Sequence, residues 1–174
     1  MTHQETTSST SATPASRTPA SQIIALVIFV VLCFAAAYVG QLATAPNIPT
    51  WYASLEKPPF NPPNEVFPIA WGILYTLMAI AAWLVWRTPD SRPRTWGLVA
   101  FAAQLVLNVA WSWGFFGAQS PLLGLVIIIP LILAILWATA LYFRVTRLGG
   151  ALMLPYLGWV CFATVLNIAI LTLN

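Results

Sequence analysis

The chain has 174 residues, of which 60% are hydrophobic and 6% charged, and its formal net charge is +3. A soluble domain carries about 25% charged residues, so this composition excludes an ordinary water-soluble surface. The small positive excess does not indicate nucleic-acid binding, and its meaning depends on where the basic residues lie.

Five stretches are long and apolar enough to cross a bilayer, which takes about 20 mostly apolar residues. They contain no Asp, Glu, Lys, Arg or His. Backbone in lipid must satisfy its hydrogen bonds internally, so we expect an all-α membrane protein, a five-transmembrane-helix bundle forming one domain over residues 21–174. The stretches are Ile23–Leu42, Val66–Trp86, Trp96–Phe116, Leu122–Phe143 and Ala151–Leu173.

Residues 1–20 are rich in Ser, Thr, Ala and Pro and have no apolar periodicity, which predicts a disordered N-terminal tail. The first span superficially resembles a signal peptide, because Ala43-Thr44-Ala45 looks like a cleavage site. Its apolar core is too long for that, so a retained helix is the better interpretation.

The first loop, between the first and second spans, is rich in proline. Each proline fixes φ, removes a backbone donor and disfavours helix in the preceding residue, so we expect extended chain here. The second helix is expected to begin near Glu65, with Asn64 as its N-cap. The loop prolines are Pro58, Pro59, Pro62 and Pro63.

Three spans carry aromatic or polar residues at helical spacing, which places each set on one helix face. The polar set in the third span should face the bundle interior, where interhelical hydrogen bonding and ligand contact both remain open explanations. The sets are Trp71, Tyr75, Met78 and Ala82 in the second span, Gln104, Asn108 and Ser112 in the third, and Tyr156, Trp159, Ala163 and Asn167 in the fifth.

The fourth span is nearly all aliphatic, and we interpret it as lipid-facing scaffold. Gly149-Gly150 is expected to break the helix after it, so that the fifth helix begins in earnest near Pro155. The third span also carries Ala110, Gly114 and Ala118, a small-residue repeat suited to close packing within or between subunits.

The basic residues outside the spans predict the orientation. Lys57 lies in the first loop, and six arginines lie in the tail and in the second and fourth loops. By the positive-inside rule, the N-terminus is cytoplasmic, and the first loop and the C-terminus are outside. The arginines are Arg17, Arg87, Arg92, Arg94, Arg144 and Arg147.

The spans offer no group for acid–base, nucleophilic or metal chemistry. The one histidine is His3, and the sequence has no metal-ligand cluster, no nucleophile–base pair and no phosphate-binding glycine loop. We therefore predict no catalytic residue, no metal and no cofactor. What remains is an apolar, aromatic cavity with a few neutral polar groups, which suits a flat hydrophobic ligand.

Four motifs in this order resemble the TspO/MBR family of tryptophan-rich sensory and translocator proteins: WYASLEKPPFNPP, WGILYTLM, QLVLNVAWSWGFFG and LPYLGWVCFATVLN. The resemblance covers residues 23–173. It implies a five-helix membrane bundle, a homodimer, and binding of porphyrins such as protoporphyrin IX in a cavity under the first loop. By motif position, it assigns ligand contact to Trp51, Tyr52, Trp71, Tyr75, Asn108, Trp111, Ser112, Trp159 and Ala163. Lys57 and the loop prolines would shape the lid.

One departure from the family concerns sterols. Mammalian members end with a proposed cholesterol-recognition stretch containing a tyrosine and a basic residue, whereas residues 163–174 contain neither. Sterol recognition by this stretch is therefore not expected. Together with the asymmetry of the arginines, the departure favours a bacterial plasma-membrane member.

Three functions are compatible with these features. The favoured one is a tetrapyrrole-binding membrane protein that senses, sequesters or transports hydrophobic ligands. The alternative is an enzyme that degrades porphyrins with light and oxygen through cavity tryptophans. The third is a structural or partner-binding role in which the cavity is incidental.

Overall fold

The computed structural model describes residues 18–174, and within them the secondary structure is helical without strands. Five long helices form the bundle, and all five are long and apolar enough to cross a membrane. Their bounds are α1 Pro19–Thr44, α2 Val66–Trp86, α3 Arg92–Ser112, α4 Pro121–Val145 and α5 Arg147–Leu173. Most of the predicted tail lies outside the described residues, and α1 begins inside the range assigned to that tail.

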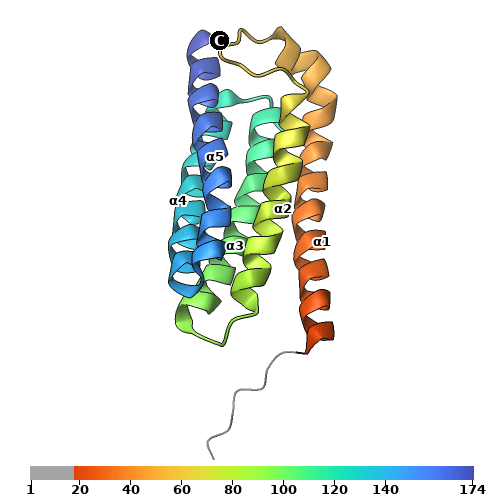
Figure 1. Cartoon of the computed structure of the whole chain (residues 1–174). Helices are drawn as coiled ribbons and strands as arrows, with labels where there is room; N and C mark the ends of the chain where they lie inside the picture. Colours follow the sequence, from red (N-terminus) through yellow and green to blue (C-terminus); the bar gives the residue numbers. More distant parts are fainter. Residues whose placement is uncertain (1–17) are drawn as a thin grey trace, which may run out of the picture.

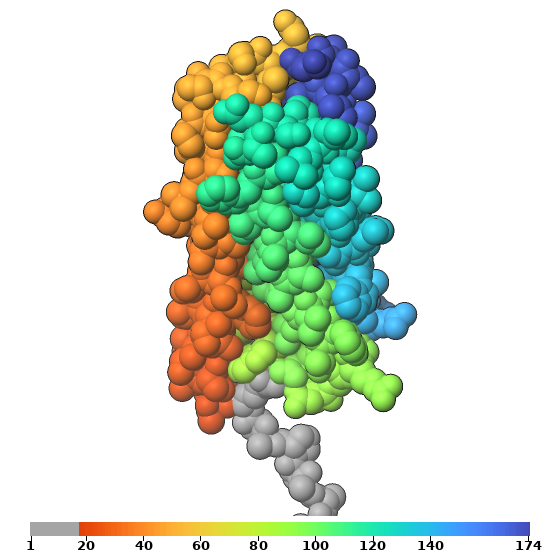
Figure 2. All heavy atoms as spheres, turned by 180° about the vertical axis from the view of Figure 1, so that it is seen from behind, coloured from red at the N-terminus to blue at the C-terminus, as the bar shows by residue number. Residues whose placement is uncertain are grey.

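The helices pack around the bundle in the order α1, α2, α5, α4, α3, and α2 also contacts α3 across its centre. Figure 1 shows the five helices side by side. The connection from α1 to α2 and the C-terminus lie at one end of the bundle, which we call the lid end, and the start of α1 lies at the other (Figure 1). Seen from behind, the same connection reaches the end of α5 (Figure 2). The α1–α2 and α3–α4 connections therefore lie at the lid end, and the α2–α3 and α4–α5 connections lie at the opposite end.

The structure corrects the prediction for the first loop. The chain after α1 stays helical through a 3₁₀ turn, η1 (Ala45–Asn47), and a π-turn, η2 (Ile48–Tyr52), and only residues 55–65 are irregular. Each of the four prolines between 58 and 63 restricts only its own backbone conformation and that of the residue before it. The helical turns that end at Tyr52 are therefore unaffected. The N-cap of α2 is Glu65 rather than Asn64, and its side chain makes no capping hydrogen bond.

The prediction that Gly149-Gly150 interrupts the helix is also wrong, because α5 starts at Arg147 and runs through both glycines and Pro155. A Cβ on Gly150 would collide with the ring of Phe143, and one on Gly149 would lie 2.8 Å from Thr146. These glycines permit a tight reversal between α4 and α5, so their role is close packing and not helix termination.

The interpretation of α4 as lipid-facing scaffold holds for only one of its faces. Ile128, Leu131, Ile135 and Tyr142 are almost completely buried, because α4 is wedged between α3 and α5. The Tyr142 hydroxyl is buried without a hydrogen-bond partner among residues 18–174. The spacing of these residues by three, four and seven is that of one helix face, so the pattern could have identified this buried surface.

Candidate functional site

At the lid end, aromatic rings from η2, α3 and the turn after it gather into what we call the aromatic cluster: Trp51, Tyr52, Trp111, Phe115 and Phe116. Phe115 is its centre. Its ring lies 5.4 Å from that of Trp51 and 5.5 Å from that of Trp111. It stacks on the Trp111 ring with an angle of 19° between the two planes. Phe116 lies 4.8 Å from Phe115 and 5.6 Å from Tyr52. Such centroid distances are those of favourable aromatic pairs.

The cluster depends on a second π-turn, η3 (Trp113–Gly117), which follows α3 directly. The amide of Ala118 donates to the carbonyl of Trp113 at 2.7 Å, and that of Ser120 donates to Phe115 at 3.1 Å. Both bonds join residues five apart, so the turn is wider than in an α-helix and successive phenylalanines can face the interior. Phe115 stands four residues after Trp111 and seven after Asn108, so helical spacing could have included it, whereas Phe116 lies off that spacing.

Residues 53–65, which we call the lid, are tied down at three points. The Tyr52 hydroxyl donates to Oδ1 of Asn61 at 2.8 Å. The ammonium of Lys57 donates to the carbonyl of Leu55 at 2.9 Å and lies 5.0 Å from the centre of the Tyr52 ring. The side-chain amide of Asn174 accepts from the amide of Glu56 at 3.0 Å and donates to its carbonyl at 3.1 Å. Both contacts of Lys57 are with residues close to it in the sequence, so they stabilise the local conformation of the lid.

Deeper in the bundle, four polar side chains form what we call the polar network: Tyr75, Gln104, Asn108 and Tyr156. Tyr75 donates to Oδ1 of Asn108 at 2.7 Å, and Nδ2 of Asn108 donates to the Tyr156 hydroxyl at 2.9 Å. That hydroxyl donates to Oε1 of Gln104 at 2.8 Å. All four are buried, so the network joins α2, α3 and α5 by hydrogen bonds within the protein.

This arrangement favours interhelical hydrogen bonding as the role of the polar set in α3. The Asn108 carbonyl oxygen and one of its amide protons are engaged, and the amide of Gln104 approaches the sulfur of Met78 at 3.7 Å. Ser112 does not join them. Its hydroxyl donates to the carbonyl of Asn108, and a Cβ on Gly40 of α1 would lie 3.0 Å from it, so Ser112 faces the contact with α1.

The remaining predicted residues connect the cluster with the network or lie beside them. The ring of Trp71 lies 5.5 Å from Tyr75 and 6.2 Å from Tyr156, directly on the network. Trp159 lies 6.0 Å from Phe67, which packs against the buried hydrophobic group of Tyr52, Phe115, Leu166 and Ile170. Ala163 is partly buried against the core. Of the nine predicted residues, Trp51, Tyr52 and Trp111 thus belong to the cluster, and Tyr75 and Asn108 belong to the network.

Asn167 lies on the predicted inward face of α5 and is buried, although it is not among the predicted ligand contacts. Its Oδ1 accepts from the indole of Trp111 at 3.4 Å, and its Nδ2 donates to the carbonyl of Pro121 at 2.8 Å. A Cβ on Gly124 would lie 2.8 Å both from this Oδ1 and from the Phe115 ring. Asn167 therefore fastens the cluster to the start of α4.

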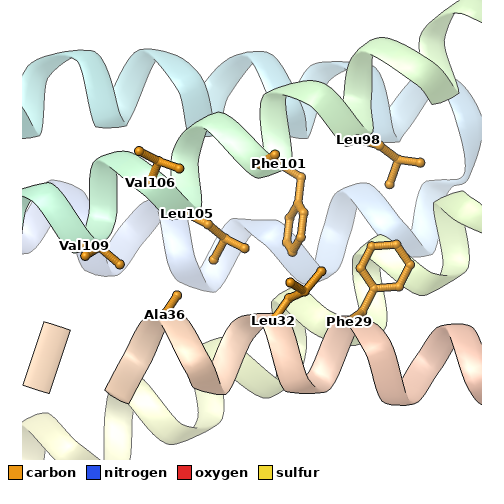
Figure 3. A pocket seen from close by; sticks show the side chains of 9 residues that line it. Phe29, Leu32, Ala36, Leu98, Phe101, Leu105, Val106 and Val109 are labelled. Carbon is orange, nitrogen blue, oxygen red and sulfur yellow. The ribbon is translucent and has the colours of Figure 1, made fainter. Parts of the chain in front are cut away.

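Two apolar grooves lie between helices. One, between α1 and α3, has a volume of about 540 Å³, and the side chains of Leu32 and Phe101 point into it from opposite walls (Figure 3). The other, between α2 and α5, has a volume of about 490 Å³ and reaches Pro62 of the lid. Of the nine predicted residues, Trp159 alone lines either groove, because the rings of the aromatic cluster pack on one another.

The chemistry of the candidate site is that of stacking surfaces with neutral hydrogen-bonding groups. Neither the cluster nor the network contains a charged side chain, and within residues 18–174 no three His, Cys, Asp or Glu side chains lie close enough to hold a metal ion. The ammonium of Lys57, in the lid, contacts the ring of Tyr52 in the cluster. The arrangement suits recognition of a planar apolar molecule.

Comparison with known proteins agrees with the fold. The profile of the TspO/MBR family matches residues 29–173. A tryptophan-rich protein TspO from Archaeoglobus fulgidus is 43% identical over 155 residues, which are 87% of this chain and 98% of the relative. A protein of the same name from Chlorobaculum tepidum is 41% identical over 88% of this chain and 98% of its own length. The human translocator protein is 36% identical over 67% of this chain and 70% of its own length. Motifs, bundle and relatives agree, and the chain belongs to the TspO/MBR family.

Proposed function

We propose that this membrane protein binds a tetrapyrrole, a porphyrin such as protoporphyrin IX, and acts in sensing, sequestration or transport of such hydrophobic ligands. The observation that carries the proposal is the aromatic cluster, five rings assembled under a hydrogen-bonded lid at one end of an apolar bundle. A planar apolar ligand can replace these ring–ring contacts by equivalent stacking on its own surface, so its insertion loses little of their energy.

Access to the cluster requires the lid to separate from the rings. The lid is held by the hydrogen bond between Tyr52 and Asn61, by those of Asn174 with Glu56, and by the packing of partly buried Leu55 near Tyr52 and Phe115. Surface loops with few buried contacts open at a lower free energy than the core, so we expect the lid and not the helices to move. The site residues of the cluster are Trp51, Tyr52 and Trp111, and those beneath it are Trp71, Tyr75, Asn108, Ser112, Trp159 and Ala163.

The test is a titration of the purified protein with protoporphyrin IX, followed by quenching of tryptophan fluorescence. We expect saturable binding by the wild type. Trp51→Leu should weaken it by about 2- to 10-fold, because it removes one aromatic contact with the ligand, worth about 0.5–1.5 kcal/mol. The matched control is Trp137→Leu, because Trp137 pairs only with Trp96 and is exposed on the outer surface. Absence of saturable binding to the folded wild type would overturn the proposal.

A second function, light- and oxygen-dependent breakdown of the porphyrin, is favoured by the placement of Trp71. Its ring contacts those of Tyr75 and Tyr156, which gives an oxidised tryptophan two neighbouring phenols as electron donors. Illumination of the complex distinguishes the two functions. A Soret band that stays intact indicates binding, and one that bleaches into a discrete product, only while the tryptophans are present, indicates catalysis.

We also propose the orientation and assembly of the protein. Five of the six arginines, Arg87 to Arg147, lie at the end of the bundle opposite the lid, which supports a cytoplasmic N-terminus and an outward lid in a bacterial plasma membrane. The homodimer that the family resemblance implies belongs to the same proposal. Labelling of single cysteines from each side and crosslinking in bilayers test the two statements separately.

A further inference from the structure

The groove between α2 and α5 differs from an ordinary lipid-facing crevice in its walls. Ile73 and Leu74 of α2 form one side, and Gly158, Trp159 and Phe162 of α5 form the other. At Gly158 an added Cβ would have no atom within 4 Å, so the wall is flat and open there. Lining residues of α5 run from Pro155 to Phe162, about 10 Å of helix at 1.5 Å per residue.

The groove is continuous with the candidate site at its upper end. Pro62 of the lid lines it, and the neighbouring lid residue Phe60 lies 6.5 Å from the ring of Phe162. Trp159 lies on the same wall, and its ring is 6.0 Å from Phe67, which packs against the buried hydrophobic group of Tyr52, Phe115, Leu166 and Ile170. The rings of Trp159 and Phe67 and the edge of the lid therefore lie between a molecule in this groove and the cluster.

The chemistry of the walls selects the occupant. An acyl chain would fill an apolar groove but would use neither the ring faces nor a hydrogen-bond donor. The indole N–H of Trp159 has no hydrogen-bond partner among the described residues, and an indole can only donate. A flat aromatic molecule that carries an acceptor, such as a carboxylate or carbonyl, uses both the ring and the donor. The volume of about 490 Å³ lies in the range of ligand pockets.

From these observations, we propose that the α2–α5 groove is a bilayer-facing binding site for a flat aromatic ligand with an acceptor group, through which the ligand passes from the lipid to the aromatic cluster. The inference rests on the proposed function and adds a route to it. Trp159 is the residue that the groove and the candidate site share, so it would hold the ligand at the threshold before the lid opens.

The experiment uses full-length protein in lipid nanodiscs and protoporphyrin IX delivered from donor vesicles, with the rates of tryptophan quenching and of its recovery measured. Gly158→Leu places a side chain in the groove from a position where an added Cβ has no atom within 4 Å, and we expect both association and dissociation to slow by about tenfold or more while Kd stays nearly unchanged. Gly72→Leu is the matched control, since Gly72 also has no atom near an added Cβ but does not line the groove.

Ala70→Leu fills the same groove from α2 and should reproduce the slower rates, which guards against a local defect in α5. Trp159→Phe keeps a ring and removes the donor. This substitution should slow the association of protoporphyrin IX. It should not slow the association of a porphyrin whose carboxylates are replaced by alkyl groups. Wild-type rates in both groove-filling variants would overturn the route and leave the proposed function standing. Absence of saturable binding to the wild type would overturn both.

Discussion

The aromatic cluster and the polar network lie in the same bundle and draw on the same inward-facing residues, yet they are held together differently. The network consists of four buried side chains joined by hydrogen bonds of 2.7–2.9 Å. The cluster consists of ring contacts beneath a lid that surface hydrogen bonds secure. Hydrogen bonds in a dry interior have no substitute when broken, whereas stacked rings can accept another ring. The network therefore holds the helices, and the cluster is the part able to admit a ligand.

The largest expected effect on stability comes from Asn108→Leu. It leaves the hydroxyl of Tyr75 without an acceptor and that of Tyr156 without a donor. Interhelical hydrogen bonds in membranes are worth about 0.6–2 kcal/mol each, so we expect a loss of about 1–4 kcal/mol. Thermal unfolding in detergent measures it, with the exposed lid variant Asn64→Leu as control. Wild-type stability combined with lost porphyrin binding would mean that Asn108 serves the ligand and not the helices.

Gly124→Val should disturb the support of the cluster. The new side chain would meet both Oδ1 of Asn167 and the ring of Phe115 at 2.8 Å from its Cβ. Overpacking of this kind costs about 1–3 kcal/mol, which would appear as a lower unfolding temperature. Gly72→Val is the control, because it introduces the same side chain into a helix with open space around it. Equal effects of the two substitutions would assign the loss to helix propensity alone.

Phe115→Leu should weaken ligand binding while leaving the polar network intact, and it should cost less stability than Asn108→Leu. It removes the stacked partner of Trp111 but leaves every side-chain hydrogen bond of the network. An aromatic pair is worth about 0.5–1.5 kcal/mol beyond its buried area, so Kd for protoporphyrin IX should rise by about 2- to 10-fold. Fluorescence titration beside Phe143→Leu, at the far end of α4, measures the difference. A larger loss of stability than in Asn108→Leu would contradict the division between cluster and network.

The smallest expected effect on the fold is that of Asn174→Ala, which removes both hydrogen bonds to the backbone of Glu56. The site is exposed, so global stability should change by less than about 1 kcal/mol, while the lid opens more often. Hydrogen exchange at the Glu56 amide should accelerate relative to the amides of α2. Thr172→Ala, which removes a local hydrogen bond to Ala169, is the control. Unchanged exchange in Asn174→Ala would show that the contacts of Asn61 and Lys57 hold the lid without Asn174.

Helical periodicity predicted the inward faces well where the helices are regular. Tyr75, Met78 and Ala82 of α2 are buried, as are Tyr156 and Asn167 of α5. The same reasoning missed Phe116, which lies off the helical spacing where the π-turn changes the period, and it passed over Phe115 although that residue continues the spacing of Asn108 and Trp111. It also assigned Ser112 to the ligand face together with Asn108, although the two side chains point to different neighbours.

The amino-acid sequence by itself determined that this protein crosses a membrane with five helices, much of what the second and fifth helices turn inward, and the family to which the chain belongs. These properties follow from composition, local period and motif order, which neighbouring residues carry among themselves. The tertiary structure decided which inward residues meet. It divided the predicted site into network and cluster, ran α5 through Gly149-Gly150 because Phe143 packs there, and tied the lid to Asn174, 118 residues along the chain. Such contacts depend on distances between helices, which no local pattern encodes.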